Sequence, residues 1–227
     1  MNAIPKFETT RLILKEITLE NIPAYKKHFV DYDVIKFLSS AVPWPYPENG
    51  IEDFVTNVII PNQGKNRWVW GIFLKSNPEE LIGCIDLWRD GKPENRGFWL
   101  GKKFWNKGII TEAVVPIIDY AFKELKFKKL IFSNAVGNIA SRKIKEKTGC
   151  KLIEIQKGSF VSSEFTCQEI WELTHDEWNK KLPLKTLKFF RIVVLLGHDN
   201  TRAAKKISRS PGSDKGVSLT YPGKQFN

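Results

Sequence analysis

RGFWLGKKFWNKGIITEA, residues 96–113, is the most informative stretch of this chain. Its pattern predicts an apolar strand, a basic turn centred on Gly108, and the first turns of a helix. The N–H groups at the start of a helix have no intrahelical acceptor, and the helix dipole favours negative charge beside them. Because Lys102, Lys103 and Lys107 add positive charge, we expect a phosphate-bearing ligand at this turn. Taken alone, the pattern fits an ordinary strand-to-helix connection with solvated lysines equally well.

The composition is that of one large domain with an appendage. The 227 residues are 42% hydrophobic and 12% aromatic, which is enough for a substantial core. We expect a folded domain over residues 1–180 and a basic tail over residues 181–227. Residues 184–227 contain nine Lys or Arg and two Asp, so they carry +7 of the net charge of +11. The basicity therefore belongs mostly to the tail and does not indicate a nucleic-acid-binding core.

The tail has two parts of different composition. Residues 187–196 form a short apolar run broken by Arg191, and residues 197–227 are rich in Gly, Ser, Lys and Pro without periodicity. We expect the second part to be disordered. The apolar run could pack on the domain, contact a membrane surface or mediate self-association.

The cysteines and histidines do not suggest a metal or redox site. Cys84, Cys150 and Cys167 are widely spaced and odd in number, so we expect reduced, mostly buried thiols. The three histidines are scattered, and we expect no metal. No stretch approaches the roughly 20 apolar residues that a membrane helix needs. The first residues lack the apolar run of a signal peptide, so a cytoplasmic location is the expectation.

Hydrophobic periodicity predicts a mixed α/β (α+β) domain. Helices are expected at 18–30, 51–60 and 138–147, and after Gly108, where Pro116 could shorten or bend the first turns. Antiparallel hairpins come first and strand-helix-strand-helix-strand follows, which predicts one mixed, mostly antiparallel sheet with helices on both faces. The sheet is expected to have six to seven strands, at residues 11–17, 68–74, 81–88, 96–100, 129–135, 151–156 and 165–173.

Four segments, in this order, resemble the GNAT superfamily of N-acetyltransferases. They are Glu8–Leu14, the loop Pro43–Pro47 with the helix after it, Gly97–Ala113, and Asn138–Cys150. Within the superfamily, the chain looks most similar to the branch of ribosomal-protein-alanine N-acetyltransferases. The resemblance covers roughly residues 8–178.

The resemblance implies acetyl-coenzyme A as co-substrate, with its pyrophosphate on backbone N–H groups of the turn at Gly108. In the family's turn pattern, Gln/Arg-x-x-Gly-x-Gly/Ala, only Gly108 matches here. Trp105 and Ile110 depart from it, and the bulk of Ile110 predicts a looser approach. The pantetheine arm would lie along the fourth expected strand, where the family's sheet splays from the fifth. The residues placed on the cofactor are Phe98, Trp99, Leu100, Trp105, Asn106, Lys107, Gly108, Ile109, Ile110, Thr111, Asn138 and Ser141.

Two of these residues have a specific role in the family. Asn138 matches the Asn that bonds the pantetheine, and it is also expected to cap its helix. Ser141 falls where that branch has a hydroxyl near the cofactor sulfur, which implies that it protonates the departing thiolate. Without the resemblance, Ser141 is simply a polar residue in the first turn of a helix.

Trp44 and Tyr46 are candidates for the acceptor side. Three prolines between positions 43 and 47 predict a stiff loop that presents both aromatic side chains. The resemblance would place them beside the acceptor amine. Alternatively, they fill a gap between the loop and the core.

The general base has two candidates. Asp86 interrupts an apolar strand, where burial would raise its pKa; alternatively it pairs with Arg89 or Arg96. Glu164, near the start of the last expected strand, is the second candidate. Glu112 lies in the first turn of a helix, where the dipole accounts for it, so it is assigned no catalytic role.

The leading interpretation is an N-acetyltransferase that moves an acetyl group from acetyl-CoA to a primary amine. The amine, on a protein N-terminus or a small molecule, would attack directly in a ternary complex of a monomer or homodimer. One alternative is a non-catalytic acyl-CoA-binding sensor. Another is a protein that binds ribosomes or nucleic acid through its basic tail, with salt-sensitive affinity.

Overall fold

The computed structural model describes residues 4–89 and 95–181. They form one eight-stranded sheet in the order β1-β2-β3-β4-β5-β6-β8-β7. Every neighbouring pair is antiparallel except β5 with β6, which confirms the mixed, mostly antiparallel sheet. The strands are β1 (Phe7–Glu8), β2 (Leu12–Glu16), β3 (Arg67–Leu74), β4 (Asn77–Trp88), β5 (Asn95–Leu100), β6 (Lys129–Ala135), β7 (Lys151–Lys157) and β8 (Cys167–Thr174).

The strand beyond the expected six to seven is β1. A tight turn produces it, because the backbone N–H of Thr9 donates to the carbonyl of Leu12 at 3.0 Å, and the N–H of Leu12 donates to Oγ1 of Thr9 at 3.1 Å. This turn folds Phe7 back beside Leu14. The β3–β4 hairpin is also tighter than expected, since β4 already begins at Asn77.

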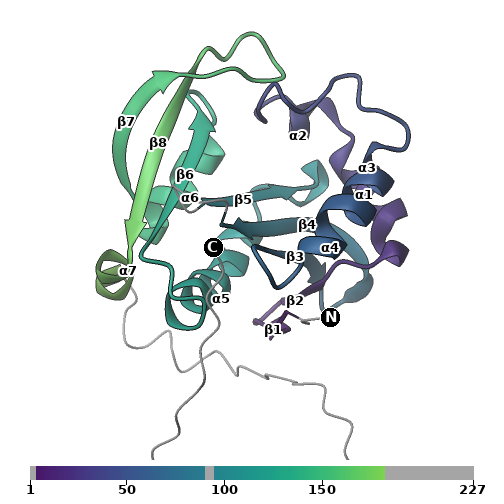
Figure 1. The fold of residues 1–227 in the computed structure, drawn as a ribbon, viewed down its shortest axis with the longest axis horizontal. Helices are drawn as coiled ribbons and strands as arrows, with labels where there is room; N and C mark the ends of the chain where they lie inside the picture. The colour runs from purple at the N-terminus through teal and green to yellow at the C-terminus, as the bar shows by residue number, and fades with distance from the viewer. Residues whose placement is uncertain (1–3, 90–94, 182–227) are drawn as a thin grey trace, which may run out of the picture. The chain divides into compact units, whose positions relative to one another are not determined.

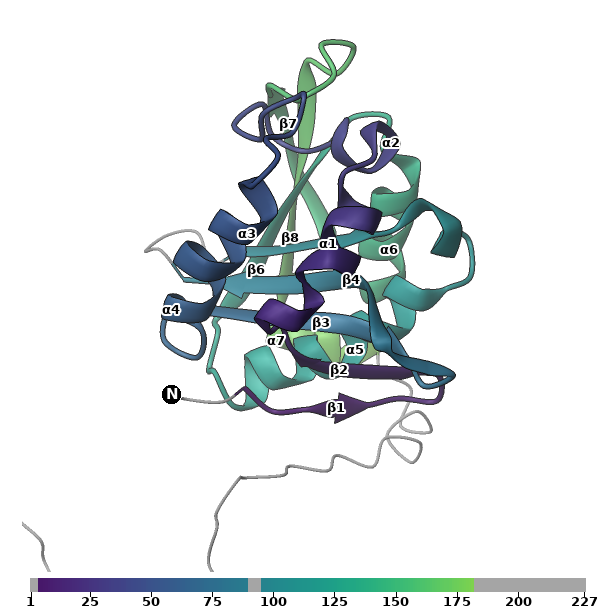
Figure 2. The same ribbon diagram turned by 90° about the vertical axis from the view of Figure 1, so that its right-hand side faces the viewer.

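Helices cover both faces of the sheet, as expected (Figure 2). One face carries α1 (Ile22–Phe29) and α3 (Gly50–Phe54), which continues through a π-helical turn (η2, Val55–Ile59) into α4 (Ile60–Asn62). The opposite face carries α5 (Ile109–Lys123) and α6 (Ile139–Thr148). The remaining elements are η1 (Leu19–Asn21), α2 (Tyr32–Ile35), η3 (Lys102–Phe104) and α7 (His175–Lys181).

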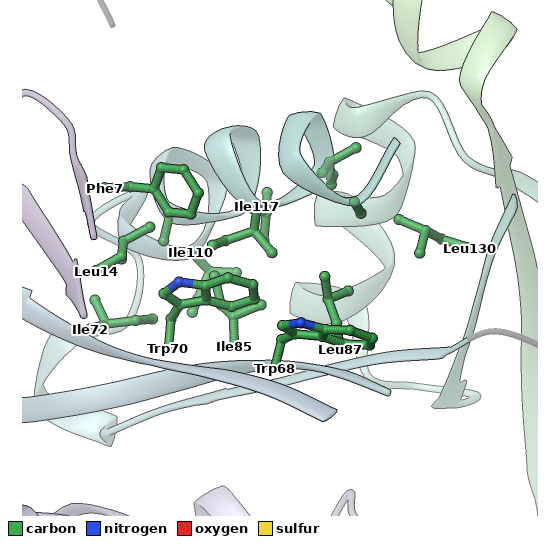
Figure 3. Packing of buried hydrophobic residues seen from close by; sticks show 14 of the residues in the cluster. Phe7, Leu14, Trp68, Trp70, Ile72, Ile85, Leu87, Ile110, Ile117 and Leu130 are labelled. Carbon is green, nitrogen blue, oxygen red and sulfur yellow. The ribbon is translucent and has the colours of Figure 1, made fainter. Parts of the chain in front are cut away.

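The larger core lies between the sheet and α5 (Figure 3). Trp68, Trp70 and Ile85 point from the sheet toward Ile110 and Ile117 of the helix, and all five are buried. Pro116 lies inside α5 and does not shorten its start, contrary to one expectation. We attribute this to the helix's many buried apolar residues, whose packing outweighs one lost backbone hydrogen bond.

A second core lies under α1 and α3. Trp99 of β5 points to this side, where its indole N–H donates to the Tyr25 hydroxyl at 3.2 Å and its ring packs on Phe29 at a centroid distance of 5.2 Å. Alternate residues of β5 therefore serve different faces of the sheet, because side chains on a strand alternate.

Three expectations fall wholly or almost wholly outside the described residues. These are the turn after Arg89, the apolar run at 187–196, and the basic tail, of which only Lys181 is described, at the end of α7. In the part of the chain that is described, no helix is both long and apolar enough to cross a membrane.

Candidate active site

The sheet opens between β5 and β6, the fourth and fifth strands of the sequence prediction. Among the described residues, Asn95 and Ile131 are the single register pair that joins these two parallel strands. Beyond that pair the strands diverge, and β6, β7 and β8 stand at a steep inclination to β2–β5 (Figure 1). The expected splay is confirmed, and it leaves the edge of β5 from Arg96 to Leu100 without a β6 partner.

A cleft with a cavity volume of about 910 Å³ begins at this opening. Its walls come from β5, β6, the start of α5 and α6, together with residues of the 33–40 segment and residues 157–160. Of the twelve residues expected to contact the cofactor, all but Lys107 line it: Phe98, Trp99, Leu100, Trp105, Asn106, Gly108, Ile109, Ile110, Thr111, Asn138 and Ser141.

The turn at Gly108 leaves the first N–H groups of α5 open. Gly108 is the N-cap residue with φ of +71°, in the left-handed region that favours glycine, and no side chain caps the helix. No hydrogen bond among the described residues uses the N–H groups of Ile109, Ile110 or Thr111. The Ile110 side chain is part of the core between the sheet and α5 (Figure 3). This arrangement can accept an anion.

A brace holds the turn, and the sequence analysis missed it. Glu112 accepts from the Thr9 hydroxyl at 2.5 Å, from the Arg11 N–H at 2.8 Å and from Nε of Arg11 at 2.7 Å. Arg11 also donates to the carbonyl of Lys107 at 2.9 Å. Partial burial alone would raise the pKa of Glu112, but these hydrogen bonds outweigh it and lower the pKa. Glu112 is therefore held by Thr9 and Arg11 in addition to the favourable helix dipole.

The three lysines of the opening stretch have protein partners. Lys102 pairs with Asp33 at 2.5 Å, Lys103 pairs with Glu80 at 3.2 Å, and Lys107 donates to the carbonyl of Lys103 at 2.9 Å. Of the described residues on the cleft walls, one is a carboxylate, Asp33, and five are other cations. The five cations are Arg96, Lys143, Lys145, Lys147 and Lys157. The cleft is therefore positively charged.

Asn138 and Ser141 lie together at the start of α6. Oδ1 of Asn138 accepts from the Ser141 N–H at 3.1 Å, so the expected cap is present. Both residues also line the cleft. The Ser141 hydroxyl accepts from Nζ of Lys145 at 2.7 Å, a contact that the sequence analysis did not predict.

The two candidate bases lie away from the cleft wall. Asp86 is buried, and its two carboxylate oxygens accept from Nε (3.1 Å) and NH2 of Arg67. Its partner is therefore neither Arg89 nor Arg96. Burial raises its pKa to about 6, although Arg67 opposes the rise. Glu164 is exposed in the loop between β7 and β8. Neither residue is among those lining the cleft.

Trp44 and Tyr46 also do not line the cleft. Trp44 packs on Tyr32 with ring centroids 5.3 Å apart, and Tyr46 packs on Phe29 at 5.5 Å. The contact of Tyr46 with Phe29 matches the alternative in which the loop fills a gap against the core.

In the described ranges, no three His, Cys, Asp or Glu residues lie close enough to hold a metal ion. Cys84 and Cys150 are buried and Cys167 is partly buried, all as free thiols.

The splayed sheet and the open helix start agree with a family-level match. The family model described as "Acetyltransferase (GNAT) domain" matches residues 11–151. The chain belongs to the GNAT acetyltransferase family. The matched region contains β5, the Gly108 turn and α6, which supply most of the cleft walls.

Known proteins resemble this chain over most of its length. The uncharacterized N-acetyltransferase YnaD of Bacillus subtilis is 25% identical over 178 residues, which cover 75% of this chain and 98% of YnaD. Mycobacterium smegmatis RimJ, solved in complex with CoA-disulfide, has a TM-score of 0.66 and 13% identity, covering 83% of this chain and 95% of that one. Spermidine N-acetyltransferase from Vibrio cholerae, solved with CoA and spermine, has a TM-score of 0.63 and 13% identity. The match covers 74% of this chain and 98% of that one.

Proposed function

We propose that this GNAT protein transfers the acetyl group of acetyl-CoA to a primary amine, by direct attack in a ternary complex. The observation that carries the proposal is the continuity of the cleft with the open start of α5. The diphosphate would bind the free N–H groups beyond Gly108, and the pantetheine arm would run along the unpaired edge of β5. The two relatives solved with CoA species support this choice of ligand.

The residues along the cleft suit thioester chemistry. When an amine attacks the carbonyl carbon, the oxygen becomes negative, and a backbone N–H on the unpaired edge of β5 would stabilise it. Ser141 would then donate its proton to the departing sulfur. Asn138 would hold the pantetheine with its amide N–H₂, because its Oδ1 already caps α6.

The acceptor attacks as a neutral amine, and Asp86 would take the proton that its nitrogen releases, through a bridging water. Its register partner on β5 is Gly97, which lines the cleft and places no side chain between them. A carboxyl with a pKa of about 6 is ionised at neutral pH and is a stronger base than an ordinary aspartate. Glu164 is the second candidate, and it is exposed in the loop between β7 and β8.

The acceptor is an amine on a protein N-terminus or a small molecule. A direct test incubates the full chain with acetyl-CoA and a panel of amines: polyamines, aminoglycosides and peptides with a free N-terminus. Thiol release and mass spectrometry of each amine are then measured together. An amine gaining one acetyl group with equal release of CoA thiol supports the proposal.

Two other outcomes contradict it in different ways. Tight binding of acetyl-CoA without turnover across the panel would indicate a sensor. Absence of acetyl-CoA binding would remove the assigned site itself.

A further inference from the structure

Two buried cations lie near Ser141, and no carboxylate in the described part of the chain pairs with either one. Arg96 of β5 is 5% exposed, and Lys145 of α6 is 1% exposed. Within the described residues, neither side chain forms an ion pair, and Nε, NH1 and NH2 of Arg96 have no hydrogen-bond partner. Burying unpaired charge is costly, so this arrangement requires an explanation.

Arg96 is held by aromatic rings instead of by an anion. Its guanidinium lies 4.3 Å from the ring centroid of Phe132 and 5.7 Å from that of Phe98. Burial lowers the pKa of Arg96 to about 10, so it still carries its charge at neutral pH. The result is a fixed positive charge in the floor of the cleft.

Lys145 is the titratable member of the pair. Burial and the charge of Arg96 lower its pKa to about 7. The other ionisable groups that face it are Cys150, which follows α6, and Glu169 of β8. Glu169 is already engaged, since it accepts from Arg142 at 3.1 Å, Asn134 at 2.9 Å and Trp171 at 3.0 Å.

The single side-chain hydrogen bond of Lys145 among the described residues is the one to Ser141, at 2.7 Å. Ser141 lies one helical turn earlier on the same face of α6, at the cleft surface. Lys145 lines the cleft but is only 1% exposed, so the Ser141 hydroxyl is its hydrogen-bonded route for exchanging a proton with the cleft.

We propose that Lys145 is a positioning residue that supplies a proton through Ser141 to the departing thiolate of CoA. This inference rests on the proposed function. When the carbon–sulfur bond breaks, the sulfur keeps the electron pair and takes the proton of the Ser141 hydroxyl. Ser141 takes a proton from the Lys145 ammonium, which becomes a neutral amine. The fixed charge of Arg96 favours this step, because releasing the proton removes like-charge repulsion.

The proton balance then closes. The attacking amine has released one proton to its base, and Lys145 recovers one from solvent through Ser141 after CoA leaves. No other co-reactant is needed.

The first test compares pH profiles of kcat for the wild type, Lys145→Met and Lys145→Arg, using acetyl-CoA and the panel amine with the fastest turnover. The wild type should lose kcat as pH rises above about 7, the pKa of Lys145. Lys145→Met should lower kcat about tenfold or more at pH 6.5, in the usual range for loss of an acid–base group, and should lack this alkaline decline. Lys145→Arg should behave like Lys145→Met, because arginine keeps the charge but does not release a proton.

A second measurement does not need an acceptor. The thiolate of bound CoA absorbs in the ultraviolet, so its formation can be titrated directly. When a thiol and a lysine ammonium interact, the charge of the ammonium stabilises the thiolate. The pair therefore loses its first proton at a lower pH than either group would without the other. The thiolate should therefore appear at lower pH in the wild type than in Lys145→Met or Ser141→Ala.

Calorimetric titration shows whether each variant still binds CoA. The matched control is Lys123→Met, at the end of α5 away from the cleft. The proposal is overturned if Lys145→Met retains wild-type kcat and its alkaline decline, if Lys145→Arg restores both, or if bound CoA titrates identically in all variants. Lack of turnover by the wild type would count against the proposed function alone, and the thiolate titration would still decide the role of Lys145.

Discussion

Arg11 and Glu112 join the first hairpin of the chain to the first turn of α5. Nε of Arg11 donates to Oε2 of Glu112 at 2.7 Å, and NH1 of the same guanidinium donates to the carbonyl of Lys107 at 2.9 Å. One side chain therefore contacts the chain on both sides of Gly108. The conformation that leaves the helix N–H groups open is fixed by a residue about 100 positions away in the sequence.

Arg11→Met should weaken binding of acetyl-CoA by about threefold to tenfold, or ~1 kcal/mol. The substitution removes the contact with the Lys107 carbonyl and leaves Glu112, whose charge opposes the diphosphate, without its cation. Calorimetric titration measures the change, with Lys6→Met on the same hairpin as control. Equal affinities for the wild type and Arg11→Met would contradict a role for the brace.

Arg67→Met should destabilise the fold in a pH-dependent way. At pH 8 the buried Asp86 carboxylate loses its cation, and breaking a buried pair in this way costs about 3–5 kcal/mol. The folded pKa of Asp86, about 6, lies above that of an unfolded aspartate. At pH 5 the folded carboxyl is therefore largely protonated and needs the cation less. Denaturant unfolding at both pH values should show that the substitution lowers the free energy of unfolding less at pH 5 than at pH 8. An equal decrease at both pH values would contradict the assigned ion pair.

Lys145→Met should stabilise the fold below pH 7. The folded pKa of Lys145, about 7, lies below that of a free lysine, so the unfolded chain binds more protons between those values. The wild-type free energy of unfolding should rise as pH increases from about 7 to 10, and the advantage of the variant should shrink over the same range. Lys147→Met, an exposed lysine of the same helix, should change stability by less than ~0.5 kcal/mol. A constant difference between wild type and Lys145→Met would contradict the buried-cation assignment.

Asp86→Asn should lower kcat about a hundredfold without changing the affinity for acetyl-CoA, as expected for loss of a general base. The wild-type kcat should also fall as pH drops below about 6, where Asp86 becomes protonated. Glu164→Gln should alter kcat by less than twofold. A larger effect of Glu164→Gln than of Asp86→Asn would reverse this assignment, and measurements with the panel amine decide it.

The features that local sequence patterns predict are those with local causes. Alternating apolar residues and the turns between them predicted seven of the eight strands, and a glycine before an apolar helix predicted the open turn at Gly108. The two-residue strand β1 was missed because a backbone turn at Thr9 creates it, and two residues show no periodicity. The helix around Pro116 was underestimated because local propensity does not include burial against the sheet.

The contacts missed at the site depend on strand register. Asp86 was expected to pair with a nearby arginine, but the antiparallel β3–β4 register brings Arg67 to it instead. The brace from Arg11 required knowing that the start of β2 lies beside α5. Lys145 could have been found, because a helical spacing of four places it on the face of Ser141, toward the cleft.

The central claim is that a diphosphate binds the N–H groups that begin α5. Calorimetric titration of acetyl-CoA into Gly108→Asp and Gly108→Asn tests it most directly. Both residues tolerate the left-handed backbone conformation better than most, so the fold should persist, but only aspartate places a negative charge at the turn. Gly64→Asp, at another glycine of positive φ, controls for the added charge.

We expect Gly108→Asp to bind acetyl-CoA at least tenfold more weakly than Gly108→Asn, and Gly64→Asp to bind like the wild type. Equal affinity for Gly108→Asp and Gly108→Asn would contradict the account, because a diphosphate on these N–H groups must respond to the charge of a carboxylate beside it.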